Sequence, residues 1–469
     1  MKLFNTLTRQ VESLQPQSPP LVTLYTCGPT VYDYLTIGNW TAYIRWDLLA
    51  RTLRDRDHSL NWYMNITDVG HLVSDADEGE DKLEKGARRE GKTAWEVAEF
   101  YTADFIQGLK DLNITVPLDH LVKATDHIPE QIALIKSLED KGYTYTTKDG
   151  VYFDSSKFET YGALARLDIT GLQAGARVEL GDKHAATDFA LWKFSPIDSR
   201  RDMEWDSPWG KGFPGWHIEC SAMAMHYLGE TLDIHAGGID HIPVHHTNEI
   251  AQSEASTGKP FAHIWLHSNF LQIDNEKIAK SAGNGYTLSE LYDKGFSPND
   301  LRVFILQSHY RSHANFTWEA LGAARNRLRR WQSIADVRWQ LSESFQILPN
   351  NALQTTSKQI RTALAEDLDS PAAYAAIESG LSMIESGVHP SDEPQLRAFL
   401  ETVRDLLGID LLATPDISKE QREFIVAREA ARKAKDWVVA DRIRSSLEAQ
   451  QIEILDSQNR SLWRRDYSK

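Results

Sequence analysis

Cysteine is nearly absent from this chain, whose 469 residues include only Cys27 and Cys220. Two cysteines so far apart do not suggest the disulfide framework of a small secreted protein, so a reducing cytoplasm is the expected compartment. Long apolar runs are also missing: none approaches the roughly 20 residues that cross a bilayer. The first residues show no signal-peptide core. We therefore expect a cytoplasmic protein that has no membrane partner.

Positive charge is scarce as well, because 51 Lys and Arg face 67 Asp and Glu, a formal net charge of −16. This balance argues against non-specific nucleic-acid binding by the whole surface, although local basic faces remain. One group is Arg325, Arg327, Arg329 and Arg330, and a second comprises six Lys or Arg between Arg428 and Arg444. Charge runs usually mark solvated helix faces, so neither group alone indicates RNA binding.

The hydrophobic pattern alternates between strands and helices in the first half of the chain. We expect strands at 21–27 and 59–66, helices at 38–56, 92–112 and 126–141, and a small β-rich insertion within 143–195. Strand, turn, helix and strand in succession predict an α/β fold with a doubly wound parallel sheet of the Rossmann type. From about residue 286 onward the pattern becomes helical.

Both cysteines lie in segments that suggest metal ligation. Cys27 ends a β-branched run and precedes a Gly-Pro turn, and Cys220 closes Gly215-Trp216-His217-Ile218-Glu219-Cys220. On a helix, His245 and Glu249 share one face because they are four residues apart. Two thiolates, an imidazole and a carboxylate suit tetrahedral zinc. The close CxxC spacing is missing, however, so buried free cysteines and a surface His/Glu pair remain open as alternatives.

Several longer motifs carry a resemblance to a known family. They are YTCGPTVYDY at 25–34, NITD at 65–68, GWHIECSAM at 215–223, DIHAGGIDHIPVHHTNEIAQ at 233–252 and REAARKAKDWVVAD at 428–441. In this order they resemble cysteinyl-tRNA synthetases, which are class I aminoacyl-tRNA synthetases. The resemblance extends over nearly the whole chain.

The resemblance implies a set of site residues around cysteine. Cys27, Cys220, His245 and Glu249 match zinc ligands; Trp216 matches an indole that packs on the substrate side chain; Asp240 and Thr67 match groups that hold the α-amino group; and Gly28 matches backbone beside the substrate. Zinc would separate cysteine from serine because a borderline-soft metal binds a thiolate far better than an alcohol. Core packing for Trp216, a helix cap for Asp240 and a purely structural zinc remain open.

Other histidines lie near the site by motif. His217, His235 and His246 belong to the matching segments and could tune the site, although for each a structural role is at least as plausible as proton transfer.

The two ATP signatures depart from the family pattern. Thr36-Ile37-Gly38-Asn39 stands where His-Ile-Gly-His or His-Ile-Gly-Asn is usual, and Lys277-Ile278-Ala279-Lys280-Ser281 stands where Lys-Met-Ser-Lys-Ser is usual. The resemblance implies that Thr36, Gly38, Asn39, Lys277, Lys280 and Ser281 contact ATP and Mg²⁺-bound phosphates. Thr36, Asn39, Lys277 and Lys280 would surround the developing charge. Thr36 carries no charge, and loss of one such donor lowers a rate by about 100- to 1000-fold.

The implied domain order is a catalytic Rossmann-type domain at 1–295 with an insertion at roughly 115–205, a stem-contact segment at 296–345, a helical bundle at 346–408 and an anticodon-binding domain at 409–469. In the last of these, Arg432, Trp437 and Asp456 match positions near the anticodon, where aromatic stacking and edge hydrogen bonds read unpaired bases. A core role for Trp437 remains equally open.

We therefore expect a monomeric cysteine–tRNA ligase that binds L-cysteine, ATP, tRNA(Cys), one Zn²⁺, and Mg²⁺ with the ATP. Two alternatives remain. One is an ATP-dependent ligase that joins cysteine to a small amine, such as an amino sugar, and would not need the C-terminal segment. The other is a catalytically weakened RNA- or zinc-binding paralogue, suggested by the altered ATP signatures.

Overall fold

The computed structural model describes residues 1–70, 81–167, 182–196, 201–278, 285–385, 387–456 and 461–467, except the side chain of Lys277. Lys280 and Ser281, two of the predicted ATP contacts, therefore lie outside the described residues. The chain forms two compact units. The first comprises Met1–Leu291 with Tyr310–Asn315, and the second comprises Tyr292–His309 with Phe316–Lys469. The finer four-part division expected from the sequence stays a prediction.

A five-stranded parallel sheet forms the centre of the first unit, in the order β11-β10-β3-β4-β5. Its strands are β3 (Leu21–Thr26), β4 (Ser59–Ile66), β5 (Leu121–Lys123), β10 (Leu232–Gly238) and β11 (Ala262–Ser268). The chain builds outward from β3 in one direction and from β10 in the other. This doubly wound order confirms the predicted fold class, and the break between β3 and β10 is where such sheets bind ligands.

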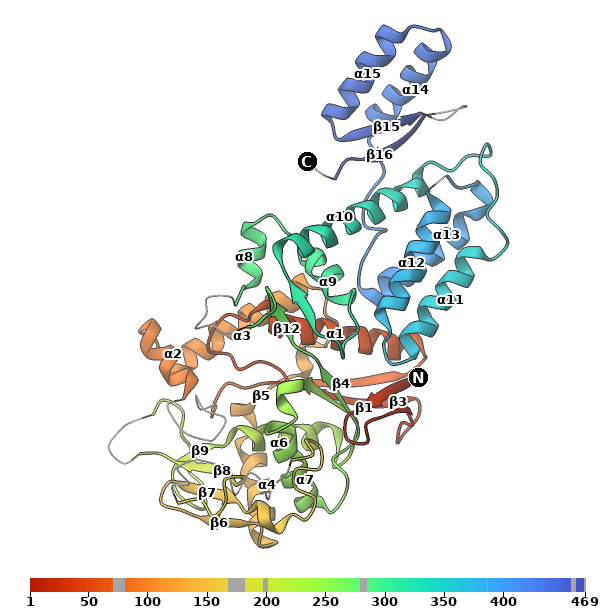
Figure 1. Cartoon of the computed structure of the whole chain (residues 1–469). Coiled ribbons are helices and arrows are strands. Elements are labelled where there is room, and N and C mark those ends of the chain that lie inside the picture. Colours follow the sequence, from red (N-terminus) through yellow and green to blue (C-terminus); the bar gives the residue numbers. More distant parts are fainter. Residues whose placement is uncertain are drawn as a thin grey trace. The chain divides into compact units, whose positions relative to one another are not determined.

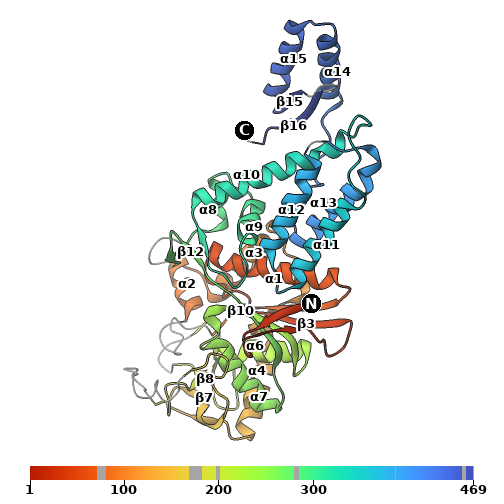
Figure 2. The ribbon, with the colours of Figure 1, turned by 45° about the vertical axis from the view of Figure 1, so that its right-hand side comes forward.

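Helices cover both faces of this sheet (Figures 1 and 2). Helix α1 (Ile37–Asp55) contacts β4 and β10 from one side, and α6 (Trp216–Leu228) packs from the other side, beside α7 (His245–Thr257). Because both faces are covered, strand β3 is buried along most of its length: Val22, Leu24 and Tyr25 are all fully buried. The predicted strands at 21–27 and 59–66 and the helix at 38–56 are confirmed to within two residues.

The remaining elements of the first unit surround this core. They are β1 (Lys2–Asn5), β2 (Gln10–Ser13), α2 (Lys82–Glu90), α3 (Ala94–Asp111), α4 (Ile128–Asp140), β6 (Thr144–Thr146), β7 (Gly150–Phe153), β8 (Phe189–Phe194), β9 (Gly212–Pro214), β12 (Leu271–Ile273), β13 (Glu276–Lys277) and the start of β14 (Ala314–Phe316). Strands β6 to β9 form an antiparallel sheet, so the β-rich character expected within 143–195 is confirmed.

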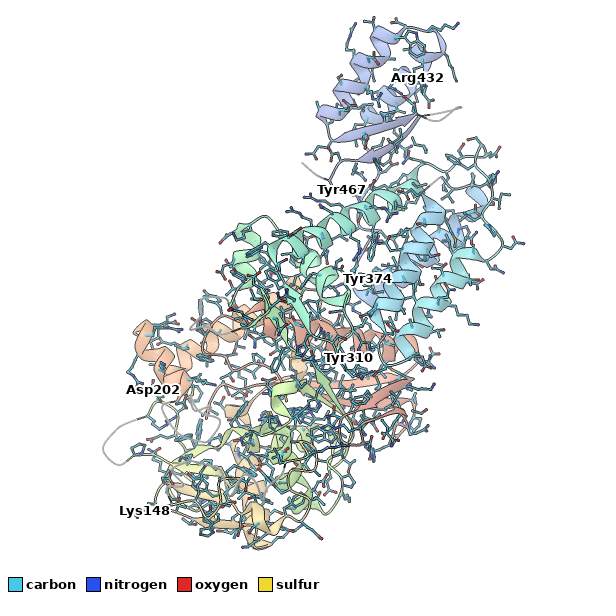
Figure 3. The ribbon with its side chains drawn as sticks, viewed as in Figure 1. Lys148, Asp202, Tyr310, Tyr374, Arg432 and Tyr467 are labelled. Carbon is cyan, nitrogen blue, oxygen red and sulfur yellow. The ribbon has the colours of Figure 1, made fainter. Side chains whose placement is uncertain are left out.

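The second unit is mainly helical, as the sequence predicts. Its helices are α9 (Pro298–Leu306), α10 (Trp318–Ala335), α11 (Ala352–Ala365), α12 (Ser370–Ile384), α13 (Glu393–Leu407), α14 (Lys419–Lys433) and α15 (Trp437–Ala449), while α8 (Leu288–Asp293) spans the boundary between the units. Tyr374 of α12, labelled in Figure 3, donates a hydrogen bond from its hydroxyl to the carbonyl of Val303. A hairpin of β15 (Ile452–Asp456) and β16 (Ser461–Arg465) follows α15. None of the described helices is long and apolar enough to span a membrane.

Candidate active site

A pocket of about 470 Å³ opens at the ends of β3 and β10, at the switch point of the sheet. The described residues that line it include ten of the predicted site residues: Cys27, Gly28, Thr36, Gly38, Asn39, Thr67, Trp216, Cys220, Asp240 and His245. They come from distant parts of the chain. Parallel strands bring them together because all carboxyl ends point to the same edge of the sheet.

Position 28 requires glycine because the backbone of Asn65 leaves no space for a side chain. A Cβ at this residue would lie 1.8 Å from the carbonyl oxygen of Asn65. The close approach lets the Gly28 amide donate to Asn65 Oδ1 at 2.7 Å, and Asn65 Nδ2 in turn donates to Thr67 Oγ1 at 3.0 Å. This chain of bonds ties the end of β3 to the end of β4 and places the Thr67 hydroxyl at the pocket.

The floor of the pocket adjoins a buried cluster of six residues: Cys27, Cys220, His235, His245, His246 and Glu249, which we call the buried cluster. Its ligand atoms form two groups that share one thiol, and within each group they lie within 4.8 Å of one another. One group is Cys27, Cys220 and His245. The other is Cys27, His235, His246 and Glu249. Three of the four predicted metal ligands thus form one group, and Glu249 belongs to the other.

Glu249 nevertheless lies close to the imidazoles of both groups. Its Oε2 atom is 3.1 Å from His235 Nε2 and 3.7 Å from His245 Nε2. Neither carboxylate oxygen of Glu249 and neither ring nitrogen of His235 makes a hydrogen bond to a described residue, although both side chains are fully buried. Buried polar groups without partners are rare in proteins. A cation would satisfy the Glu249 oxygens and the unprotonated ring nitrogen of His235, so the donor set fits a metal ion.

Burial favours the neutral forms of both the thiol and the imidazole in this cluster, and only the neutral imidazole is already in the form that binds a metal. Burial raises the pKa of the Cys27 thiol well above its usual range, and the neighbouring Cys220 and Glu249 raise it further. Burial also lowers the pKa of His246 well below its usual range, so this imidazole stays neutral, the form that ligates metals. A divalent cation would lower the pKa of the Cys27 thiol again, because a coordinated thiol is deprotonated.

Hydrogen bonds extend from the cluster to the N-terminal hairpin. His246 Nε2 lies 3.2 Å from Cys27 Sγ, and its Nδ1 lies 2.7 Å from Nε2 of His267. His267 Nδ1 lies 2.8 Å from Thr6 Oγ1. This chain fixes the orientation of the His246 ring, as the partners of ligating imidazoles commonly do.

One wall of the pocket carries the residues predicted to hold the amino acid. The rings of Trp216 and His245 lie 4.4 Å apart at 39°, so the indole lies beside the cluster. His217 Nδ1 lies 3.0 Å from His245 Nδ1, and burial lowers the pKa of His217 to about 3. Asp240 lies in a 3₁₀ turn whose N-cap is Gly238, and the N-cap of the following helix α7 is Val244, so Asp240 caps neither element.

The opposite wall carries the start of α1. Asn39 Oδ1 accepts hydrogen bonds from the Thr36 amide at 3.0 Å and from Thr36 Oγ1 at 2.9 Å. Thr36 therefore directs its hydroxyl proton toward its own helix. A Cβ at Gly38 would lie 2.7 Å from Ile278 Cδ1, so the two ATP signatures meet in van der Waals contact at this glycine. Lys82 is the one Lys or Arg among the described lining residues, and the sequence had not singled it out.

The residues predicted to contact the anticodon lie in the C-terminal hairpin and its helices. Asp456 accepts hydrogen bonds from Arg432 Nη1 at 2.7 Å and from both terminal nitrogens of Arg428 at 2.7 and 2.8 Å. Figure 3 labels Arg432 on α14. Trp437 begins α15 with 58% of its surface exposed, which argues against the core role left open by the sequence. The charge run at Arg327 and Arg330 is paired, chiefly with Glu378 of α12.

Comparison with known proteins matches this geometry to a family. The family model described as tRNA synthetases class I (C) catalytic domain matches residues 13–326. Cysteine–tRNA ligase 1 of Burkholderia lata is 45% identical over 462 residues, covering 97% of this chain and 95% of that protein. Cysteine–tRNA ligase of Treponema denticola is 40% identical over 499 residues and 99% of each chain. This chain belongs to the cysteine–tRNA ligase family. It is an enzyme of the class I aminoacyl-tRNA synthetases.

Solved structures of other class I synthetases share the fold. A leucyl-tRNA synthetase of Agrobacterium radiobacter K84 superimposes with a TM-score of 0.62 at 12% identity, covering 85% of each chain. A methionyl-tRNA synthetase of Mycobacterium tuberculosis gives a TM-score of 0.58 at 13% identity, covering 84% of this chain and 92% of the other. At these identities the likeness shows the Rossmann-type fold alone.

Proposed function

We propose that the protein is a cysteine–tRNA ligase that activates L-cysteine with ATP and transfers it to the 3′ end of tRNA(Cys). The observation that carries this proposal is the pocket, where two thiols and an imidazole form one wall region and the start of α1 forms another. Binding of both substrates in one pocket explains how the reacting atoms meet. Membership of the family supports the same activity. We expect the enzyme to act as a monomer in the cytoplasm, where its buried free thiols would stay reduced.

We propose further that the cluster holds one Zn²⁺ through Cys27, Cys220, His245 and Glu249. The first three offer ligand atoms within 4.8 Å of one another, and Glu249 lies 3.7 Å from the ring of the third. The unsatisfied oxygens of Glu249 support its inclusion. When bound, zinc would supply a site that accepts a substrate thiolate and rejects an alcohol. His235 and His246 would surround the metal and orient its ligands.

The amino acid would lie between the cluster and Asp240. Its side chain would point toward the thiols and pack on Trp216. Its ammonium group would pair with the Asp240 carboxylate and donate to the Thr67 hydroxyl, while the Gly28 backbone allows close approach. This arrangement leaves the carboxylate of the substrate directed at the nucleotide, which is the geometry that adenylation needs.

Adenylation then requires no nucleophile from the enzyme. A carboxylate oxygen of cysteine attacks the α-phosphorus of Mg²⁺-bound ATP, the bond to the bridging oxygen breaks, and pyrophosphate leaves with the electron pair. Thr36, Gly38 and Asn39 at the start of α1, with Lys277, Lys280 and Ser281, would position the phosphates and stabilise the developing charge. The terminal ribose hydroxyl of tRNA next attacks the activated carbonyl, and AMP leaves.

The C-terminal segment distinguishes this function from ligation of cysteine to a small amine. The alignments with tRNA ligases run through 97–99% of the chain, so they include this segment. We propose that Arg432, Trp437 and Asp456 lie at the anticodon, with the exposed indole stacking on an unpaired base. Pairing of Arg432 with Asp456 would hold both groups ready for base edges.

Cysteine-dependent ATP–pyrophosphate exchange, followed by charging of matched tRNA, tests the proposal. The enzyme should perform both reactions. Exchange without charging would favour the small-amine ligase, and absence of both would favour the weakened paralogue.

Removal of residues 409–469 separates the two steps. We expect the truncated enzyme to keep adenylation, because the pocket lies wholly in the first unit, and to charge tRNA at least about tenfold less well. Far-ultraviolet circular dichroism would check that the remainder stays folded, since β16 contributes bonds to Asp336 and Gln340 of the retained part. Unchanged charging would show that this segment does not read the anticodon.

A further inference from the structure

Two large aromatic side chains stand exposed at the edge of the pocket. Tyr34, which lines the pocket, has 43% of its surface exposed, and Phe100 of α3 has 44%. Their ring centroids lie 6.2 Å apart, and each also contacts the buried ring of Tyr101, at 5.2 and 5.1 Å. A single exposed aromatic needs no explanation, but a supported pair beside a substrate pocket marks a binding surface.

Basic side chains accompany these rings. Residues 82–92, which form α2 and its turn to α3, contain five Lys or Arg and two Glu in a chain whose net charge is −16. Lys92 Nζ lies 4.6 Å from the centroid of the Phe100 ring, and the exposed Arg89 lies 3.3 Å from Asp33, another residue of the pocket lining. Arg88 is exposed on the same helix. We call Tyr34, Phe100, Arg88, Arg89 and Lys92 the aromatic rim.

Surrounding bonds fix the rim in place. Thr93 and Glu96 form a capping box at the start of α3, and the Ala94 amide donates to Asp202 Oδ2 at 2.9 Å. The Asp202 amide donates to Glu84 of α2 at 2.9 Å, so Asp202, labelled in Figure 3, joins the first turns of both helices. The Phe100 ring is therefore presented by an anchored helix, and Tyr34, which precedes α1, packs on Tyr101 of that helix. This anchoring lowers the entropy lost when a ligand stacks on the rings.

Exposed rings beside basic side chains fit single-stranded nucleic acid, which would compete with Glu90 for Arg89 and Lys92, now 3.0 and 3.1 Å from that carboxylate. Each base offers a face for stacking, and each phosphodiester offers a negative charge to a nearby Lys or Arg. The reaction requires one such strand to reach this pocket, because the terminal ribose of tRNA must meet the adenylate inside it. We propose that the aromatic rim binds the unpaired 3′ end of tRNA and leads it into the pocket. This proposal rests on the proposed function and assigns it a second tRNA contact, separate from the C-terminal segment.

Phe100→Ala provides the main test, because Phe100 is exposed and does not line the pocket. Loss of one stacked base should raise the KM for tRNA in charging by about tenfold, and this loss should exceed any loss in pyrophosphate exchange by the same factor. Lys92→Ala should act in the same direction, with a smaller effect at high salt. Equal losses in both reactions would overturn the proposal.

Trp95→Ala is the matched control. Trp95 lies on the same helix and is similarly exposed, at 46%, but its indole donates to the carbonyl of Asp202 and its ring packs near Trp205, away from the described pocket lining. Charging by Trp95→Ala should follow the wild type. If Trp95→Ala and Phe100→Ala lose charging equally, the loss comes from disturbance of α3, and the rim has no specific role.

A second measurement identifies the occupant. Equilibrium binding of intact tRNA and of the same tRNA without its 3′-terminal CCA, to wild type and Phe100→Ala, forms a double-mutant cycle. Phe100→Ala should weaken binding of intact tRNA by about tenfold and leave binding of the shortened tRNA as in the wild type. An equal effect on both tRNAs would place another part of the molecule on the rim. No effect on either would leave the rim without a nucleic-acid role. Both outcomes overturn the proposal.

The proposed function can fail independently of this inference. If the wild-type enzyme does not charge tRNA(Cys), a short single-stranded RNA that ends in CCA still tests the rim, through quenching of tyrosine and tryptophan fluorescence. Binding that Phe100→Ala weakens would retain the nucleic-acid surface without the ligase activity. Absence of binding by the wild type would overturn the rim as well.

Discussion

The buried cluster in the first unit and the hairpin in the second unit satisfy the hydrogen-bonding capacity of their carboxylates in opposite ways. In the cluster, both oxygens of Glu249 and both ring nitrogens of His235 lack hydrogen bonds to described residues. In the hairpin, both oxygens of Asp456 accept bonds from arginines, and Ser461 Oγ adds a third partner at 3.2 Å. A polar group without a partner destabilises the fold, so it persists where a ligand completes it. The comparison contrasts a cluster with polar groups that lack hydrogen bonds to described residues and a carboxylate that is bonded to its neighbours.

Loss of a thiol should have the largest effect. Cys220→Ala removes one of two buried sulfur ligands, so we expect the purified protein to lose most of its zinc and its activation of cysteine. Metal analysis by mass spectrometry measures the loss of zinc, and pyrophosphate exchange measures the loss of cysteine activation. Met223→Leu, a volume-conserving change in the buried face of the same helix, serves as the control and should keep its metal. Full retention of zinc by Cys220→Ala would contradict the ligand assignment.

Substrate discrimination comes next in size. A hydrophobic pocket separates close analogues by about 10- to 200-fold, whereas a metal that binds the thiolate should exceed this range. We therefore expect serine to be activated more than about 200-fold less well than cysteine, measured as kcat/KM in pyrophosphate exchange. Comparable activation of the two amino acids would show that any bound metal is structural.

Glu249→Gln is the most direct test of the difference between the buried cluster and the C-terminal hairpin. In the zinc-bound enzyme, loss of a ligand should weaken zinc binding by more than about 100-fold, since changes even to outer partners of ligands cost 10- to 100-fold. In the metal-free protein, the same change removes a buried carboxylate that has no hydrogen bond to a described residue, so the free energy of unfolding should stay equal or rise. Urea denaturation with and without a chelator measures both effects. A clear loss of stability in the metal-free protein would mean that Glu249 is a structural partner of its histidines.

Asp456→Asn should lower stability, whereas Glu249→Gln in the metal-free protein should not, and its effect should be the smallest of those predicted here. It leaves Arg428, which is buried, without its anionic partner, and should lower the stability of the hairpin by about 2 kcal/mol. Hydrogen exchange of the β15–β16 amides in the whole chain would measure this loss, with Glu453→Gln as the exposed control on the same strand.

The acid dependence of this pair has a definite sign. Bonds from Arg428 lower the pKa of Asp456 to about 2, below its usual value near 3.9 in an unfolded chain. The stability from this carboxylate is therefore fully present above about pH 4 and disappears as the pH falls toward 2. Asp456→Asn should abolish that part of the acid dependence, and an unchanged profile would contradict the assignment.

The sequence predicted which residues line the pocket better than it predicted the contacts among them. Motifs and strand ends located ten lining residues, because parallel strands impose a common edge on residues far apart in the chain. They could not predict that Glu249 contacts His235 and His246. Which side chains of strand β10 and helix α7 face each other is determined only by the packing of these two elements. The same limit applies to Asp456: a motif marks it as functional, but its two arginine partners follow from the docking of α14 on the hairpin.

The contact between Gly38 and Ile278 has a consequence for how this enzyme can change over generations. An added Cβ at Gly38 would lie 2.7 Å from Ile278 Cδ1, the far end of a flexible side chain, so a larger residue at position 38 would require that side chain to move aside. Among descendants of this sequence, a larger residue at position 38 should therefore appear together with a shorter side chain at position 278, so changes at the two positions should be coupled.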